Sequence, residues 1–435
     1  MVLAVARWQN WAGNQAAAPQ RVITPRSAEE VAETIALATL DGLTVRMTGS
    51  GHSFTPVAVT SGVMLQPGGL RAIRAVDEDA GEVTVEAGCR LRDLNEHLYA
   101  HGLALANMGD IQEQTVAGAI QTGTHGTGRD LGGIAAQVTA LEMVLADGSI
   151  VSCSADQATE LFQAARIGLG ALGVLTAVTF RVVPAFLLAA REEPMNWAEV
   201  IARLDELASA NEHFEFYWFP HTDGCLTKRN NRSDGPPRPL PRWRHQLDDE
   251  FLSNTVFGAT CRLGQRYPAV IPAINAVAGK ALGARTYTDA AYRVFTSPRR
   301  VRFKEQEYAI PREHLAEALT AIRGLFSRHA WRISFPIEVR IAPGDDVWLS
   351  TAYGRSTAYI AIHVFHTAPH EEYFREVEAV MTALGGRPHW GKLHTRDAAY
   401  LRGAYPRFAD FVALRDHVDP ARRFGNPYLE QVLGS

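Results

Sequence analysis

Apolar and polar residues alternate in short runs along the first part of the chain. Residues 43–47 form an apolar run that is typical of a buried strand. Residues 82–87 alternate with period two, which predicts a strand with one buried face. A helix is expected over residues 28–40, because Ser27 stands at its N-cap position and Gly42 follows its last turn. The pattern therefore predicts helices alternating with strands.

The pattern changes after Pro184. Residues 214–219 form an aromatic strand suited to a pocket wall or a sheet face, whereas residues 228–247 hold several Arg and Pro and predict a long exposed loop. Further strands are predicted at 302–309, 333–341 and 358–365, and helices at 267–282, 312–330 and 369–384. We therefore predict an α+β chain whose second part is an antiparallel sheet with helices.

This change of pattern sets the predicted domain boundaries. Residues 1–184 form the first domain and residues 185–395 the second. Residues 396–435 are expected to return to the first domain and cover it, so that the two domains are interleaved.

Composition narrows the function classes. The 435 residues are 46% hydrophobic and 21% charged, with a net charge of −4. The absence of a basic excess argues against nucleic acid, and four scattered cysteines without a C-x-x-C argue against a metal site. No apolar run reaches the roughly 18 residues that span a bilayer, and polar residues stand where a secretory signal would be apolar. We expect a cytoplasmic protein, and the sequence leaves its oligomeric state open.

A glycine turn, Thr48-Gly49-Ser50-Gly51-His52-Ser53, follows the first buried strand. Glycines let the backbone approach a ligand closely, and successive amides in such a turn suit a pyrophosphate. A Rossmann loop is excluded because Phe54 stands at the third glycine position and Thr55-Pro56 opposes a helix. No G-x-x-x-x-G-K-[S/T] occurs either. The turn is thus a phosphate-loop candidate of another kind.

A second unusual segment covers residues 107–128, where glycine and threonine are dense. Such small residues with free hydroxyls suit a loop wrapped around a ligand, and the alternative is a flexible surface loop. A third glycine-rich stretch, residues 168–173, allows close backbone packing before the strand that starts near Val174.

Together these motifs resemble the vanillyl-alcohol-oxidase (PCMH-type) FAD proteins. The turn at residues 49–53 and the segment 122–128 are similar to the two FAD segments of that superfamily. Residues 335–340, 346–350 and 389–392 resemble the substrate-domain and C-terminal signatures of the aldonolactone oxidases and dehydrogenases within it. The resemblance implies a two-domain PCMH-type fold with a substrate (cap) domain. It also implies FAD, a sugar-1,4-lactone substrate, and O2 or another electron acceptor.

The resemblance also assigns residues to the cofactor. His52 matches the histidine that is often bonded covalently to the flavin, and the alternative is a histidine that only packs on the ring. The implied cofactor-binding residues are Thr48, Gly49, Ser50, Gly51, His52, Ser53, Gly109, Asp110, Thr115, Gly118, Thr122, Gly123, Thr124, His125, Gly173, Val174, His389 and Lys392. Gly109 falls at the position that controls access of O2 to the flavin, and a glycine there favours an oxidase that yields H2O2.

Four residues are the candidates for catalysis. Glu338 and Arg340 share one face of a strand because they are two residues apart, and the pair can bind hydroxyl groups or form a structural ion pair. The resemblance places His363 near the substrate as a base or a polar contact, although a lone histidine in an apolar strand is usually a core residue. It places Lys392 beside the flavin, where a cation stabilises the reduced ring. Asp110, Glu338, Arg340 and Phe365 are the implied substrate-binding residues.

Other functions stay open at this point. An alditol oxidase acting on xylitol or sorbitol shares the same loops, although Asp110 and Phe365 stand where those enzymes tend to have small hydroxyl residues. An NADPH-dependent flavin reductase and a non-catalytic flavin-binding module are the further alternatives. Covalent attachment at His52 and the signature at residues 389–392 argue against the reductase. Retention of all four catalytic candidates argues against the module, namely Glu338, Arg340, His363 and Lys392.

Overall fold

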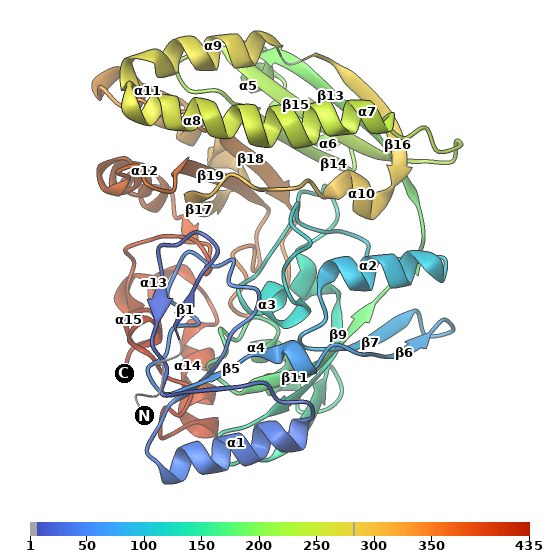
Figure 1. Ribbon diagram of the computed structural model, residues 1–435, viewed down its shortest axis with the longest axis vertical. Coiled ribbons are helices and arrows are strands. Elements are labelled where there is room, and N and C mark those ends of the chain that lie inside the picture. Colours follow the sequence, from blue (N-terminus) through green and yellow to red (C-terminus); the bar gives the residue numbers. More distant parts are fainter. Residues whose placement is uncertain (1–6, 282) are drawn as a thin grey trace, which may run out of the picture.

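The computed structural model describes residues 7–281 and 283–435. Two halves lie one above the other, with two smaller sheets in the lower half and one large sheet in the upper half (Figure 1). Helices and strands are mixed throughout, which confirms the predicted α+β class. Both ends of the described chain lie at the lower half.

The lower half contains a parallel and an antiparallel sheet. The parallel sheet has the order β3 (Arg21–Ile23), β5 (Val63–Leu65), β4 (Val45–Met47). The antiparallel sheet has the order β10 (Ile150–Ser154), β9 (Val138–Val144), β11 (Val174–Arg181), β7 (Glu82–Glu86), β6 (Ile73–Asp77). Two short pairs join β1 (Trp8–Gln9) to β2 (Ala16–Ala17) and β8 (Leu103–Ala104) to β12 (Val183–Pro184). The strand predicted before the glycine turn is therefore present as β4.

The helices of the lower half are α1 (Ala28–Leu40), α2 (Leu91–Ala100), α3 (Val116–Gln121), α4 (Thr159–Ala165), α13 (Ala398–Ala404), α14 (Phe408–Val418) and α15 (Pro427–Leu433). Helix α1 begins as predicted, because the hydroxyl of Ser27 accepts a hydrogen bond from the Glu30 amide at 3.2 Å. It ends before Gly42, whose φ of +66° suits glycine. Thr115 caps α3 in the same way, through the Gly118 amide.

The C-terminal helices share the core of the lower half. Leu401, Phe408 and Val432 are buried in the same cluster as Val83 and Val85 of the antiparallel sheet. The backbone amide of Val45 also donates to the carbonyl of Arg423 at 2.8 Å. These contacts place the C-terminal helices against the sheets of the lower half, while the predicted domain boundaries at residues 184 and 395 and the assignment of residues 396–435 to the first domain stay predictions.

The upper half is one antiparallel sheet. Its order is β16 (Arg285–Ala290), β13 (Leu187–Asn196), β15 (Gly224–Ser233), β14 (His213–Trp218), β18 (Ile337–Ala342), β19 (Thr357–Phe365), β17 (Phe303–Pro311), β20 (Arg387–Pro388). The accompanying helices are α5 (Trp197–Ala202), α6 (Leu204–Ser209), α7 (Arg242–His245), α8 (Phe257–Arg266), α9 (Ile271–Ala281), α10 (Ala291–Phe295), α11 (Leu315–Arg328) and α12 (Glu371–Ala383).

The two faces of this sheet differ in chemistry. On one face the apolar side chains of its central strands pack against α11 and α12 and form a separate core. Alternation along the strands places the intervening residues on the other face. Charged residues occupy that face, and they contact the lower half. The candidate site lies between the two halves for this reason.

The prediction of an exposed loop at residues 228–247 holds for residues 234–241 and is wrong at both ends. Residues 228–233 belong to β15, which lies inside the sheet between β13 and β14. The polar side chains of β15 are compatible with burial because Lys228 pairs with Glu215 and Arg229 pairs with Glu193. After a turn, α7 then begins a helical stretch that runs on through Gln246–Val256 into α8.

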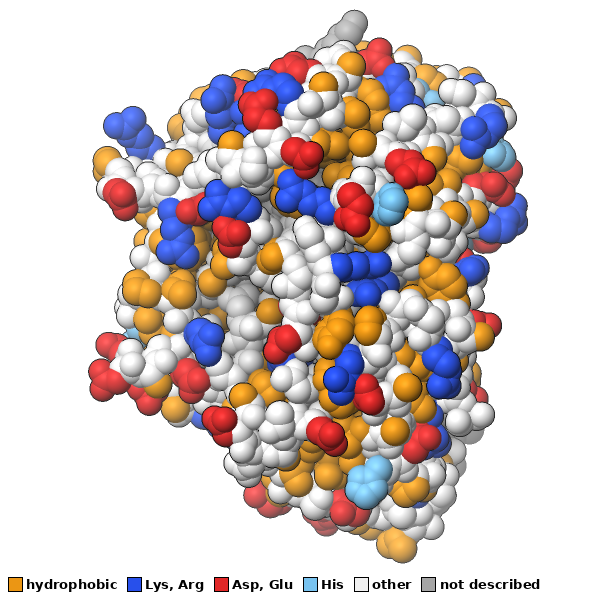
Figure 2. Space-filling view, turned by 180° about the vertical axis from the view of Figure 1, so that it is seen from behind, with side chains coloured by type: hydrophobic (Ala, Val, Ile, Leu, Met, Phe, Trp, Pro, Cys, Tyr) orange, Lys and Arg blue, Asp and Glu red, His pale blue; other side chains and the backbone are white. Residues whose placement is uncertain are grey.

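Charged side chains of both signs are interspersed over the face seen from behind (Figure 2). Within the described residues, no helix combines the length and the apolar character that a membrane span needs.

Candidate active site

A cavity lies beside the glycine turn in the lower half, with about 910 Å³ of empty space when the open solvent at its mouth is included. Its walls come from β4 and the turn, from the start of α3, from residues 169–175 and from Phe424. The predicted cofactor residues that line it are Thr48, Gly49, Ser50, Gly51, His52, Ser53, Thr115, Gly118, Thr122, Gly173 and Val174. Segments far apart in the sequence thus meet around one hollow.

The turn requires its two glycines. Gly51 has a φ of +74°, which side-chain-bearing residues rarely adopt. A Cβ atom on Gly49 would lie 2.8 Å from the Thr115 hydroxyl oxygen, so glycine permits the turn to approach the N-terminus of α3. Ser50 fixes the other side by donating to the Glu113 carbonyl at 2.6 Å. This cradle fits a pyrophosphate, which backbone amides and a helix N-terminus bind well.

Arg46 is a cavity residue that the sequence did not single out. It is buried, and its two terminal nitrogens donate to four carbonyls, those of Val57, Leu169, Gly170 and Phe424. Its Nε has no hydrogen-bond partner among the described residues. Burial lowers the pKa of this guanidinium to about 10. Arg46 therefore joins three wall segments of the cavity to β4.

His52 stands at one end of the turn and lines the cavity. Its ring lies 5.6 Å from that of Trp11. Burial lowers the pKa of His52 to about 4, and the charges of Lys392 and Arg90 add to this effect. The imidazole is therefore neutral at physiological pH.

A first group of charged residues, the carboxylate–arginine cluster, occupies the polar face of the upper sheet. It consists of Asp110, Glu215, Tyr217, Lys228, Arg299, Glu338 and Arg340. Arg340 bonds to Glu338 and lies 2.9 Å from Glu215 and 3.6 Å from Asp110. Arg299 reaches Asp110 at 2.5 Å from the segment between α10 and β17. Glu338 and Arg340 share one strand face, as their spacing predicted.

The carboxylates of this cluster differ in proton affinity. Burial opposes ionisation of Asp110, but Arg299 and Arg340 outweigh it and lower its pKa. For Glu338, burial together with the nearby Asp110 and Glu215 raises the pKa, against the opposing charge of Arg340. The Tyr217 hydroxyl donates to Glu338 at 3.1 Å. Glu338 is therefore the carboxylate here with a raised pKa, a property of general bases.

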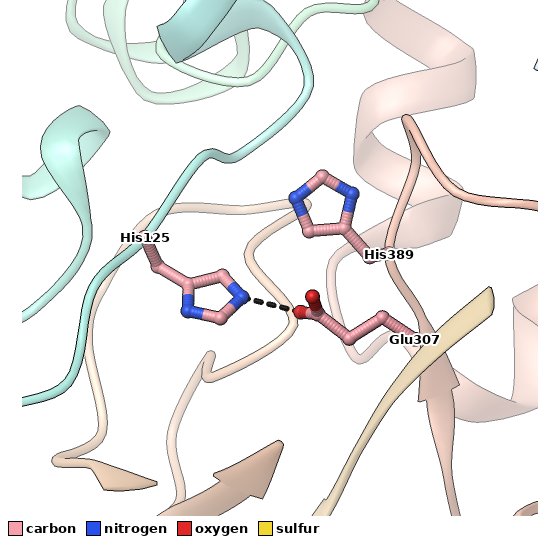
Figure 3. A group of neighbouring side chains, drawn as sticks. All are labelled: His125, Glu307 and His389. Atoms are coloured by element: carbon pink, nitrogen blue, oxygen red, sulfur yellow. Dashed lines mark hydrogen bonds and ion pairs between the residues drawn. The ribbon is translucent and has the colours of Figure 1, made fainter. Parts of the chain in front are cut away.

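A second group, the Lys392 cluster, lies on β17, β19, the segment after β20 and the segment after α3. It consists of His125, Glu305, Glu307, His363, His389 and Lys392. Glu305 bonds to Lys392 and lies 3.5 Å from the Nε2 atom of His363. Glu307 accepts a hydrogen bond from His125 at 2.5 Å, with the ring of His389 beside this pair (Figure 3).

His125, Glu307 and His389 place possible ligand atoms within 4.8 Å of one another. Both ring nitrogens of His125 already face acceptors, since Nδ1 lies 3.0 Å from the Gly126 carbonyl and Nε2 faces Glu307. The backbone amide of Gly391 donates to Nδ1 of His389 at 3.0 Å. Hydrogen bonds thus explain why these three side chains lie close together.

The other predicted residues lie outside the cavity lining. Gly123, Thr124 and His125 border a smaller hollow against Tyr359. Phe365 belongs to an apolar cluster with Phe303 and Phe335. Gly109, Asp110, His389 and Lys392 do not line the cavity, and Asp110 instead contacts Arg299 and Arg340.

Comparison with known proteins decides the family. Residues 178–432 match the family described as D-arabinono-1,4-lactone oxidase, and residues 19–154 match the family described as FAD binding domain. The chain belongs to the D-arabinono-1,4-lactone oxidase family. As a family member it is an oxidoreductase with FAD as its cofactor.

Relatives of this D-arabinono-1,4-lactone oxidase family member cover nearly its whole length. An L-gulono-1,4-lactone dehydrogenase of Mycobacterium tuberculosis is 44% identical over 98% of this chain and 99% of its own. An L-gulonolactone oxidase of Bos taurus is 35% identical, with 98% of each chain covered. A cholesterol oxidase from B. sterolicum has a TM-score of 0.84 at 18% identity over 98% of this chain and 96% of its own, which shows the shared fold.

The cavity fits the cofactor of this family. The cradle at Gly49 and Gly51 suits the pyrophosphate. The buried cation Arg46 bonds to four carbonyls, and no carboxylate among the described residues pairs with it. An anionic dinucleotide would offset that charge.

Several residues of the clusters were missed at the level of sequence. Glu305 and Glu307 are two residues apart on a predicted strand, which is the spacing that drew attention to Glu338 and Arg340. That signal could have found them. Lys228 lay in the segment mistaken for a loop, and no sequence signal connects Arg299 with Asp110.

Proposed function

We propose that this protein oxidises the neutral sugar lactone L-gulono-1,4-lactone, or its L-galactono and D-arabinono counterparts. The observation that carries the proposal is the carboxylate–arginine cluster. Three carboxylates, on Asp110, Glu215 and Glu338, are balanced by three cations, on Lys228, Arg299 and Arg340. Such a balanced set offers many hydrogen bonds and no net charge, which suits an uncharged polyhydroxyl substrate and disfavours an anionic sugar acid.

In this proposal, different residues of the cluster transfer the proton and orient the substrate. Glu338, with its raised pKa, accepts the proton of the substrate hydroxyl at the carbon that is oxidised. Arg340 donates hydrogen bonds to substrate oxygens and is held in place by Glu215. FAD, when bound, supplies the redox chemistry by accepting the hydride.

We assign His363 a donor role in place of that of a base. Its Nδ1 faces the Pro336 carbonyl at 3.2 Å and its Nε2 faces the Glu305 carboxylate at 3.5 Å. Both neighbours are hydrogen-bond acceptors, which suits a donor at this position better than a base. Lys392 contributes a positive charge near His52, at the end of the cavity where we place the flavin ring.

An anaerobic substrate series tests the function. We expect L-gulono- and L-galactono-1,4-lactone to bleach the oxidised flavin far faster than xylitol, sorbitol or the open-chain gulonate anion. Faster bleaching by the polyols would identify an alditol oxidase, and bleaching by NADPH alone would identify a reductase. Adding O2 to the reduced protein then measures its use as acceptor, for which the glycine at position 109 is the supporting feature.

We infer that His52 carries the flavin covalently. It lines the cavity, and its neutral imidazole has the free lone pair that a nucleophile needs. Acid-denatured protein should keep flavin fluorescence on a gel, and His52→Ala should lose it while still binding FAD reversibly. His97→Ala, at a surface histidine, is the control and should keep the fluorescence. A non-fluorescent band from the unaltered protein would exclude the covalent bond.

A further inference from the structure

Glu305 lies at the centre of the Lys392 cluster. It sits on β17 directly opposite His363 of β19, and it points to the same face as Glu307. Its side chain is only 6% exposed. Its contact with His363 helped to assign that residue, but no role has been given to its bond with Lys392, and a buried acid that contacts two basic side chains needs an explanation.

Backbone hydrogen bonds fix the geometry of the Glu305–Lys392 pair. The Leu393 amide donates to the Glu305 carbonyl at 2.9 Å, and the His389 amide donates to the Glu307 carbonyl at 3.0 Å. The segment that carries Lys392 is therefore tied to β17 on both sides. The same segment is tied to the residues after the glycine turn, because the Phe54 amide donates to the Gly391 carbonyl at 2.7 Å. Lys392 thus holds a fixed place between Glu305 and the turn.

The charges of this pair offset each other. Burial opposes ionisation of Glu305, but Lys392 and His363 outweigh it and bring its pKa to about 2. Burial also opposes the charge of Lys392, but Glu305 and Glu307 outweigh it and raise its pKa. Both groups are ionised at neutral pH. Glu307 is already bonded to His125, so Glu305 is the carboxylate that bonds to Lys392.

We propose that Glu305 is a positioning residue that holds Lys392 in place and offsets its charge. Glu305 thereby sets how strongly the site stabilises an anion at the flavin end of the cavity. This inference rests on the proposed role of Lys392. It predicts that the site is less electropositive than Lys392 alone would make it, and that removal of the Glu305 charge increases the affinity for anions there.

Glu305→Gln tests the inference because it removes the charge and preserves the shape. Sulfite, an anion that flavins bind reversibly, is the probe, and loss of flavin absorbance gives its Kd. We expect the Kd for sulfite to fall at least about tenfold, and the two-electron potential of the bound flavin to rise by about 30 mV, the equivalent of a tenfold change. Unchanged values would overturn the inference.

Glu378→Gln is the matched control. Glu378 is as buried as Glu305, but it bonds to Tyr308 and Thr395 and has no contact with Lys392. The affinity for sulfite should stay within about twofold in this variant. A tenfold change would show that any lost buried carboxylate alters the flavin, which would contradict a specific role of Glu305.

A second set of variants separates the two proposals. Lys392→Met should weaken sulfite binding, and adding Glu305→Gln to it should produce a smaller gain than Glu305→Gln produces alone, because Glu305 then lacks the cation that keeps it ionised. If Lys392→Met leaves the Kd unchanged, the proposed role of Lys392 fails. If Lys392→Met weakens binding but Glu305→Gln alone has no effect, only the role of Glu305 fails. Should Glu305→Gln not retain FAD, Glu305→Asp keeps the charge and should bind sulfite within about twofold of the unaltered protein. A tenfold tighter Kd in Glu305→Asp would overturn the inference.

Discussion

At the scale of single residues, burial decides what each charged group can do. Arg46, Glu305 and Glu338 are buried and Asp110 is partly buried, yet their surroundings affect them differently. Carbonyls surround Arg46, two arginines face Asp110, and a lysine faces Glu305. Glu338 has two other carboxylates nearby, and its pKa is raised. A carboxylate is thus an ionised partner of arginine or lysine at Asp110 and Glu305, and it is the proposed proton acceptor at Glu338.

Arg46→Met should destabilise the protein by about 3–5 kcal/mol, because four carbonyls lose their donor. Urea unfolding of the FAD-free protein measures the loss. Arg21→Met is the control, since Arg21 forms an exposed pair with Asp41 and should matter by less than about 1 kcal/mol. Equal losses in the two variants would refute the role of Arg46 as an anchor.

Because of the Glu305 carboxylate, the free energy of unfolding should decrease as the pH falls through the acid range. Its folded-state pKa of about 2 lies below the ordinary 4.5, so its contribution is complete above the ordinary value and is lost as pH falls towards 2. Urea midpoints should therefore differ between unaltered protein and Glu305→Gln at about pH 7, and the difference should shrink at about pH 3.5. A difference that is the same at both values would contradict the shift.

At the scale of elements, capping and pairing decide which segments form. The N-cap residue of helix α1, Ser27, can be identified from the sequence alone, and the helix forms where the pattern predicts it. Strand β15 has no such local signal. Its charged residues fit inside a sheet only because Glu193 and Glu215 lie on the neighbouring strands. Local patterns therefore identified α1 and failed for β15.

Ser27→Ala should cost about 1 kcal/mol of stability, since the Glu30 amide loses its acceptor at the N-terminus of α1. The free energy of unfolding from urea titration gives this value. Ser27→Asp supplies another good N-cap and should remain within about 0.5 kcal/mol of the unaltered protein. Loss of stability in Ser27→Asp as well would point to a cause other than capping.

At the scale of the whole molecule, the candidate active site lies at an interface between two halves. The lower half supplies the cavity, Asp110 and His125, and the polar face of the upper sheet supplies most of the other residues of the two charged clusters. The last helices complete the lower half, and Phe424 closes one wall of the cavity. Cofactor and substrate chemistry can meet only when this interface is formed.

Removal of residues 396–435 should abolish FAD binding and leave the protein aggregated or unfolded. The segment contributes Leu401, Phe408 and Phe411 to the main core, each almost fully buried. Soluble yield and the ratio of flavin to protein absorbance measure the effect. Removal of Ser435 alone, which is exposed, should change neither value. A soluble truncated protein with full FAD content would contradict this dependence.

The sequence by itself determined the class of elements, the glycine turn and the spacing of Glu338 and Arg340. These features depend on neighbouring residues, whose geometry is fixed by backbone sterics and by the period of helix or strand. The tertiary structure alone decided that Arg46 meets four carbonyls, that Arg299 meets Asp110 and that Glu305 meets Lys392. These partners are far apart in the chain and come together only through strand order and packing. Burial by that packing, which no local pattern encodes, then sets the pKa of each group.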